Sequence, residues 1–179
     1  SSDRIKNFWN SADNYDILYT KNATEALNLL SVSFENHVKY GDIIVLSEYE
    51  HHSNILPWKR VAERKGANIV LLPLLESGKL DYSLLDGLPK DRIKIISLSC
   101  QSNITGYCVD VEKIQKFRKG LNIYLFLDVS QMVGHRHVDF SKIDADAYCM
   151  SAHKMYGPKN LGACFIRKDL IPLMQPFML

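Results

Sequence analysis

The segment ADAYCMSAHKMYGP, residues 145–158, decides the fold, because it joins a mostly apolar run to a cluster of polar side chains. Such a run is typical of a strand covered on both faces of a sheet. Six similar runs occur elsewhere, at 17–19, 43–46, 69–72, 93–98, 123–127 and 162–166. The sequence therefore predicts several strands assembled into one largely buried sheet.

Helical patterns lie between several of these runs. A helix is predicted after Asn22, where Glu25 three residues later gives a start resembling a capping box. A second helix is predicted from about residue 53 to the cap residue Gly66, and a third over 111–120. Residues 4–10 are predicted as the end of a further helix. Strands alternating with helices predict a three-layer α/β/α fold with a mostly parallel mixed sheet.

Composition limits the classes of function. The chain has 179 residues, 46% of them apolar, which is enough to form one globular domain. Its 22 basic and 20 acidic side chains give no broad electrostatic argument for nucleic acid or an acidic membrane. No apolar run approaches the roughly 20 residues that span a bilayer, and the first ten residues lack a signal-like core. We therefore expect a soluble, non-secreted protein.

The four cysteines contain no CxxC pair, and most lie in or beside apolar segments, where buried free thiols are common. They predict a reducing compartment, the cytoplasm. Both ends of the chain are abrupt: it begins at Ser1 rather than Met, and residues 170–179 carry two prolines and an apolar tail. These features predict a piece of a longer protein.

Polar clusters follow the predicted strands. In open parallel sheets, ligands bind at the carboxyl ends of the strands. The clusters that lie there are 20–24, 50–54, 101–106, 128–131 and 151–158. Together they offer an acid, an amine, imidazoles, an amide and donors for an anion at one edge of one sheet.

Several of these groups suit a phosphate. Free backbone amides at Ala23 and Thr24, at the start of the first helix, with the Thr24 hydroxyl, form an anion site. Ser151 and His153 add side-chain donors.

The remaining groups suit a heterocyclic aldehyde. Asp128 at the end of a buried strand would hold a ring nitrogen protonated, with an attraction of about 4 kcal/mol at ~4 Å and an effective dielectric near ~20. His51 offers a flat ring for stacking, and Lys154 an amine that forms a Schiff base. Pyridoxal phosphate (PLP) needs all of these groups.

Five motifs also carry a family resemblance. They are NATEALN (22–28), EHHSNILPW (50–58), SNITG (102–106), DVSQ (128–131) and SAHKMYGP (151–158). In this order they resemble the class V aminotransferases, and among these the cysteine desulfurases of the SufS (group II, NifS-like) branch. The resemblance extends from about residue 4 to residue 170. It implies the large domain of a fold type I PLP-dependent transferase, with residues 1–179 as a partial cofactor-binding domain that lacks an N-terminal segment and the C-terminal small domain.

The resemblance implies a role for each site residue. Lys154 would form the Schiff base and carry the proton at the substrate α carbon, and His51 would stack on the ring. Asp128 would pair with the pyridine nitrogen, Gln131 would hydrogen-bond the phenolic oxygen, and Asn103 would contact the substrate carboxylate. The implied phosphate ligands are Thr24, Ser151, His153 and the amides of Ala23 and Thr24.

The implied reaction converts L-cysteine to L-alanine and leaves a persulfide on the enzyme for a sulfur-acceptor protein, in iron–sulfur cluster assembly or sulfur transfer. Members of the family are homodimers. The family's persulfide cysteine and carboxylate-binding arginine lie far beyond the Schiff-base lysine. Because none of the four cysteines matches the nucleophile's place, the chain alone is predicted to be inactive.

The sequence is also compatible with other functions. A selenocysteine lyase or another class V enzyme would share the cofactor motifs. His135 and His137, two apart as on one side of a strand, could bind zinc with Asp128 or Asp139 in a metal-dependent hydrolase. A non-enzymatic fragment could associate through its apolar tail.

Alternative structural roles also exist for single residues. His52 is read as a capping and packing residue where the second helix begins. Asp128 could be only a turn residue, and Asn103 could simply shape the turn at Gly106.

Overall fold

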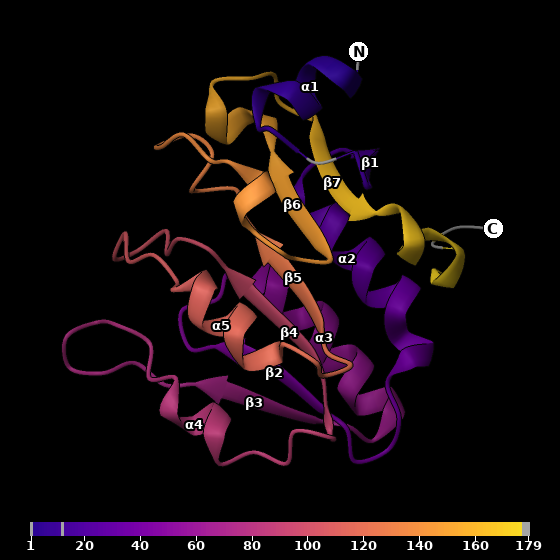
Figure 1. Ribbon diagram of the computed structural model, residues 1–179, viewed down its shortest axis with the longest axis vertical. Coiled ribbons are helices and arrows are strands. Elements are labelled where there is room, and N and C mark those ends of the chain that lie inside the picture. The colour runs from indigo at the N-terminus through magenta and orange to yellow at the C-terminus, as the bar shows by residue number, and fades with distance from the viewer. Residues whose placement is uncertain (1, 12, 177–179) are drawn as a thin grey trace.

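The computed structural model describes residues 2–11 and 13–176, which form one seven-stranded mixed sheet with helices on both faces (Figure 1). The order of strands across the sheet is β1-β7-β6-β5-β4-β2-β3. The strands are β1 (Tyr15–Thr20), β2 (Ile43–Ser47), β3 (Asn68–Leu72), β4 (Ile93–Ser99), β5 (Tyr124–Asp128), β6 (Ala147–Ser151) and β7 (Gly162–Arg167). Every predicted strand is present.

The sheet has a parallel part and an antiparallel edge. Strands β2 to β6 pair in parallel, whereas β7 runs antiparallel to both β6 and β1. The connection between β6 and β7 holds only one short 3₁₀ turn, η3 (Ala152–Met155), and lacks the long crossover that a parallel neighbour needs. The predicted mostly parallel mixed sheet is confirmed.

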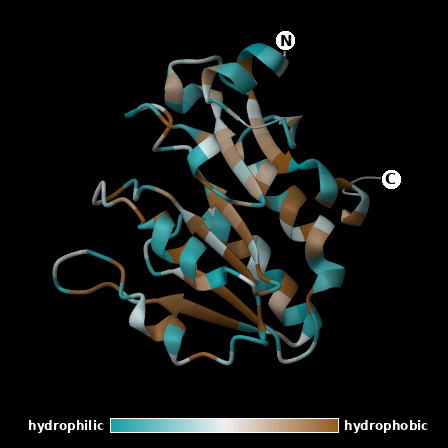
Figure 2. Ribbon diagram, in the orientation of Figure 1, coloured by the Kyte–Doolittle hydropathy of each residue, from teal (hydrophilic) through white to brown (hydrophobic). Residues whose placement is uncertain are grey.

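Two hydrophobic clusters cover the two faces of the sheet. On one face, α2 (Ala23–Phe34) and α3 (His52–Lys65) pack Leu30 and Trp58 against Phe126 of β5. On the other face, α4 (Ser83–Asp86) and α5 (Val111–Arg118) contribute Leu85 and Ile114 to a larger cluster, and α1 (Ser2–Phe8) packs at its margin. In Figure 2 the apolar colour concentrates on the central strands and the polar colour on the outer helices. The three layers are as predicted.

The helix ends differ in detail from the prediction. Helix α3 begins at His52 because His51 is its N-cap, and it ends as expected at Gly66, which has the left-handed φ of 65°. Helix α5 ends at Arg118 rather than Gly120, because Lys119, with ψ of 123°, has already left the helical conformation. The four-residue α4 and the remaining 3₁₀ turns, η1 (Glu35–His37), η2 (Phe140–Lys142) and η4 (Lys168–Leu173), are too short to show a periodic pattern.

The C-terminal tail is better packed than the sequence suggests. Leu170 is buried, and the Gln175 amide donates to the Ser33 carbonyl of α2 at 3.0 Å. The expected unprotected tail is therefore partly covered, because Ile171 and Met174 pack against the cluster that contains α2, while Leu173 stays 46% exposed. Residues 177–179 lie outside the described residues.

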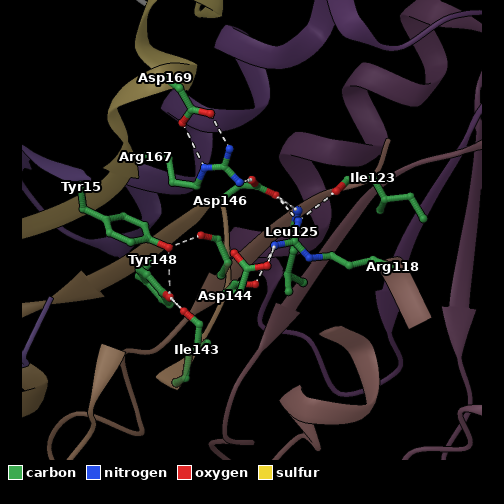
Figure 3. Close-up of polar contacts among 11 residues, drawn as sticks. Tyr15, Arg118, Ile123, Leu125, Ile143, Asp144, Asp146, Tyr148, Arg167 and Asp169 are labelled. Carbon is green, nitrogen blue, oxygen red and sulfur yellow. Dashed lines mark hydrogen bonds and ion pairs between the residues drawn. The ribbon is translucent and has the colours of Figure 1, made fainter. Parts of the chain in front are cut away.

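A buried network of ion pairs lies at the end of the sheet where β5 and β6 begin (Figure 3). Arg118 contacts Asp146 at 2.6 Å, and Arg167 contacts the other oxygen of the same carboxylate at 3.1 Å. The Leu125 amide also donates to Asp146 at 2.7 Å. Burial raises the pKa of Asp146, and the two arginines counteract this rise. The network joins α5, β6 and β7 at the end of the sheet opposite the candidate site.

Candidate functional site

A cavity of about 320 Å³ lies at the carboxyl ends of β4, β5 and β6. Its wall comes from segments distant in sequence that the parallel strands bring to one edge of the sheet. The lining residues are Asn22, Ala23, Thr24, His51, Ser53, Ser99, Gln101, Asn103, Asp128, Ser130, Gln131, Ser151, His153 and Lys154. All the site residues named from the sequence are in this wall.

The end of the cavity at α2 is built around a helix start. The Asn22 side chain caps α2 by accepting from the Glu25 amide at 2.8 Å. The Ala23 amide, expected to be free, donates instead to Ser151 Oγ at 2.8 Å, so this expectation is wrong. The cause is the close approach of α2 to the end of β6, which no local pattern encodes. Thr24 is exposed, and its amide at the second helical position has no intrahelical partner.

Gly162 makes this approach feasible. It pairs with Ser151 on one side and with Thr20 on the other, directly beneath the turn that leads into α2. A Cβ atom at Gly162 would lie 2.6 Å from the Cα and carbonyl carbon of Asn22. Only glycine therefore lets the start of α2 rest on the first residue of β7.

Asp128 forms the buried floor of the cavity. Its side chain accepts from the Ser130 amide at 2.9 Å through Oδ1, whereas Oδ2 has no donor in the part of the chain that the structure describes. Burial raises the pKa of Asp128, and Ser130, His51 and Lys154 act in the opposite direction. The open Oδ2 is therefore free to accept a hydrogen bond from a donor placed in the cavity.

His51 has a capping role as well as a place in the cavity wall. Its Nδ1 accepts from the Ser53 amide at 3.2 Å and lies 2.8 Å from Ser53 Oγ. The capping role expected of His52 therefore belongs to its neighbour, because the helix begins one residue earlier than the apolar pattern indicates. These contacts fix the orientation of the His51 ring at the cavity.

Glu50 anchors the segment that carries His51. Its buried carboxylate accepts from Ser47 Oγ at 2.5 Å, from Asn54 Nδ2 at 2.8 Å, and from the amide and hydroxyl of Ser99 at 2.9 and 2.6 Å. Burial raises the pKa of Glu50, and these hydrogen bonds oppose the rise. Glu50 thus ties the ends of β2 and β4 to the first turn of α3.

Lys154 lies in η3, directly after β6, with its side chain at the cavity. Gly134 packs against its backbone so closely that a Cβ atom there would lie 2.2 Å from the Lys154 carbonyl oxygen. Tyr156, with φ of 63°, ends the turn. Lys154 is therefore held by backbone packing rather than by side-chain hydrogen bonds of its own.

Asn103 lies in the exposed turn after β4 and lines the cavity. The hydrogen bonds that shape this turn come from Ser102, whose Oγ accepts from the amides of Ile104 and Thr105 at 3.2 Å. The structure therefore leaves the Asn103 side chain available to a ligand.

Sequence reasoning missed part of the wall. The wall residues that lay in or beside the predicted polar clusters but received no site role of their own are Asn22, Ser53, Ser99, Gln101 and Ser130. One signal for two of them was present: Ser99, Gln101 and Asn103 are spaced by two, as on one side of an extended segment. Ser53 and Ser130 follow His51 and Asp128 by two residues and could be found only once the turns were known.

The zinc alternative has no matching geometry. His135 and His137 lie in the loop after β5 and not on a strand. No group of three His, Cys, Asp or Glu side chains that could hold a metal ion occurs within residues 2–11 and 13–176.

The four cysteines are free, and none lines the cavity. None of the helices described here has the length and apolar character needed to cross a bilayer.

Comparison with known proteins identifies the family of this chain and proteins that share its fold. The family described as Aminotransferase class-V matches residues 1–179. The chain belongs to the class-V aminotransferases. Within this family it is 37% identical over 176 residues to a cysteine desulfurase of Wigglesworthia glossinidia brevipalpis, covering 97% of this chain and 43% of the relative.

Two solved structures of similar proteins have the same fold. One is the cysteine desulfurase CsdA of Escherichia coli in an S-sulfonic acid form, with a TM-score of 0.91 and 31% identity over 98% of this chain and 44% of that chain. The other is the apo cysteine desulfurase of Thermococcus onnurineus NA1, with a TM-score of 0.91 and 30% identity over 99% of this chain and 44% of that one. This class-V aminotransferase chain spans about 43% of the length of the curated relatives that it matches.

Proposed function

We propose that this chain is the PLP-binding part of a cysteine desulfurase that converts L-cysteine to L-alanine and passes the sulfur to an acceptor protein. The similarity to cysteine desulfurases over nearly the whole chain supports the activity. The single observation that carries the proposal is the cavity at the strand ends, where Asp128, Lys154, His51 and the start of α2 meet.

The donors and acceptors of this cavity fit PLP. The open Oδ2 of the buried Asp128 suits a pyridinium nitrogen, and the Thr24 amide and hydroxyl suit a phosphate. The Ser151 hydroxyl accepts from Ala23, which leaves its own proton to donate to that phosphate. The cavity volume of about 320 Å³ is at the small end of the range for ligand pockets.

In this proposal the chain's residues bind, orient and move a proton. When bound, PLP supplies an aldehyde and an electron sink for negative charge at an amino-acid α carbon. Lys154 is the covalent attachment point and the proton carrier at that carbon. His51 stacks on the ring, Gln131 donates to the phenolic oxygen, and Asn103 contacts the substrate carboxylate. His153 adds a further donor to the phosphate.

We do not assign the nucleophile to any of the four cysteines of this chain, because none of them lines the cavity. Cys100 is fully buried, and burial raises the pKa of its thiol, which makes it a poor nucleophile. We propose that the persulfide cysteine and the carboxylate-binding arginine lie in the part of the relatives' length that has no counterpart here. We also propose that residues 1–179 belong to the large domain of a cytoplasmic homodimer that serves iron–sulfur cluster assembly or sulfur transfer.

Covalent trapping tests this proposal. Purified chain incubated with PLP is expected to acquire a visible absorbance band, and borohydride is expected to bleach the band and fix the cofactor on Lys154, as peptide mass spectrometry would show. Lys154→Ala should remove both signals. Lys159→Ala is the matched control, because Lys159 is exposed in the same loop but does not line the cavity. Labelling of a different lysine, or equal labelling of Lys154→Ala, would contradict the assignment.

A further inference from the structure

Gln101 is a cavity residue to which neither the motifs nor the comparisons give a role. It lies in an extended segment after β4, fixed by a bridge to Cys108 and by the hydrogen bond from the Ser102 amide to the Tyr107 carbonyl at 2.9 Å. Alternate side chains of an extended segment point to one side. Accordingly Ser99, Gln101 and Asn103 all line the cavity, while Cys100 and Ser102 are buried.

The Gln101 amide has no protein partner. Its Oε1 is buried without a hydrogen bond, and its side chain makes none with any residue that the structure describes. Buried polar side chains just behind the cavity are satisfied, since Glu50 and Asn54 bond to each other and to their neighbours, whereas in the cavity wall Ser130 Oγ also lacks a partner among the described residues. Because an unpartnered buried polar group is costly, a bound ligand is the natural partner for this amide.

The order of strands in the sheet indicates which part of a bound ligand lies near Gln101. The phosphate donors lie at β6 and the start of α2, whereas Gln101 follows β4, on the other side of β5 and Asp128. The proposed phosphate site is therefore remote from Gln101. On the segment that carries Gln101, the nearest cavity residue with an expected ligand contact is Asn103, which is expected to contact the substrate carboxylate. A carboxylate only accepts hydrogen bonds, and an amide side chain can turn its NH₂ toward it by rotating half a turn.

We propose that Gln101 is a second amide donor, beside Asn103, for the carboxylate of the amino-acid substrate. This inference rests on the proposed function, since it takes an α-amino acid as the occupant of the cavity. Gln101 then contributes to specificity for amino acids over amines of the same size, and the free protein carries its unpartnered amide until substrate binds.

The experiment compares two ligands that differ only in the carboxylate. The chain loaded with PLP is titrated with L-alanine, the product, and with L-alaninol, and the cofactor absorbance is followed. Gln101→Leu is expected to weaken the apparent affinity for L-alanine by about tenfold, the value of one hydrogen bond to a charged group, and to change that for L-alaninol less than twofold. Gln101→Glu should weaken L-alanine binding further, because it places a negative charge beside the carboxylate.

Two further measurements separate binding from folding. Without PLP, Gln101→Leu is expected to melt about 2–4 °C higher than the wild type, because the substitution removes the unpartnered amide. The matched control is Gln115→Leu, a glutamine of α5 that does not line the cavity; it should leave both titrations unchanged.

Each outcome decides the inference. Equal L-alanine affinity in Gln101→Leu and wild type, an equal loss for both ligands, or a PLP-loaded wild type that does not respond to L-alanine would overturn the role of Gln101 and leave the cofactor assignment standing. A wild-type chain that takes up no PLP would contradict the proposed function, and the inference with it.

Discussion

Two buried carboxylates near the cavity have opposite surroundings. Glu50 accepts hydrogen bonds from Ser47, Asn54 and Ser99, so its oxygens are fully used within the protein. Among the residues that the structure describes, Asp128 accepts only from the Ser130 amide, and its Oδ2 stays open. Because burial without partners is costly for a carboxylate, the first acid stabilises the fold, and the second suits a ligand.

The pH dependence of stability follows from the raised pKa of Asp128. An acid whose native pKa is raised keeps its proton where the unfolded chain has released it, so the free energy of unfolding falls as pH rises through that window. Asp128→Asn removes this contribution. The variant without PLP should melt above the wild type at neutral pH, and the difference should vanish below pH ~3, where the unfolded acid is also protonated.

The same substitution, Asp128→Asn, should weaken PLP binding even though it stabilises the protein without PLP. Loss of the charged partner of the ring nitrogen is expected to weaken PLP affinity about 10- to 100-fold in Asp128→Asn. Thermal melts at several pH values and a PLP titration check the two effects. Unchanged melting together with unchanged PLP affinity would show that Asp128 has neither role.

At the scale of elements, the start of α2 depends on a strand to which it is not adjacent in sequence. The helix is capped locally by Asn22, but the Ala23–Ser151 hydrogen bond forms only because Gly162 lets the turn approach β7. A similar close contact, between Gly134 and the Lys154 carbonyl, sets the position of η3. Backbone contacts between elements thus position both ends of the proposed cofactor.

Gly162→Ala tests this dependence. The added methyl group should displace the turn at Asn22, lower the free energy of unfolding by about 1–3 kcal/mol, and weaken PLP binding more than binding of pyridoxal, which lacks the phosphate. Chemical denaturation and the two titrations measure these effects. Gly87→Ala is the control: its new Cβ would meet Leu84 at an ordinary 3.7 Å, so a change within about 0.5 kcal/mol is expected. Equal losses for PLP and pyridoxal would argue against a phosphate site at this turn.

At the scale of the whole molecule, the two ends of the sheet have separate tasks. The ion network of Arg118, Asp146 and Arg167 lies where β5 and β6 begin (Figure 3). The cavity lies where these two strands end. Removing one partner of a buried ion pair leaves an uncompensated charge, which costs far more than loss of an exposed pair.

Arg118→Met should therefore lower the free energy of unfolding by about 3–5 kcal/mol and leave PLP affinity within about twofold at a temperature where the variant is folded. Lys116→Met provides the comparison, because the Lys116–Glu112 pair is exposed and its loss should leave the free energy of unfolding nearly unchanged. Urea denaturation and PLP titration are the measurements. A large loss of PLP affinity in folded Arg118→Met would show that the two ends are coupled.

The sequence alone determined the strands, the main helices and the polar residues at the strand ends, because apolar periodicity and caps such as Asn22 act over a few neighbouring residues. Only the tertiary structure decided that β1 and β7 run antiparallel, that Ser151 accepts from the Ala23 amide, and that the Gln101 side chain has no partner within residues 2–11 and 13–176. These features depend on distances between segments far apart in the chain, and a local pattern contains no information about such distances until packing has set them.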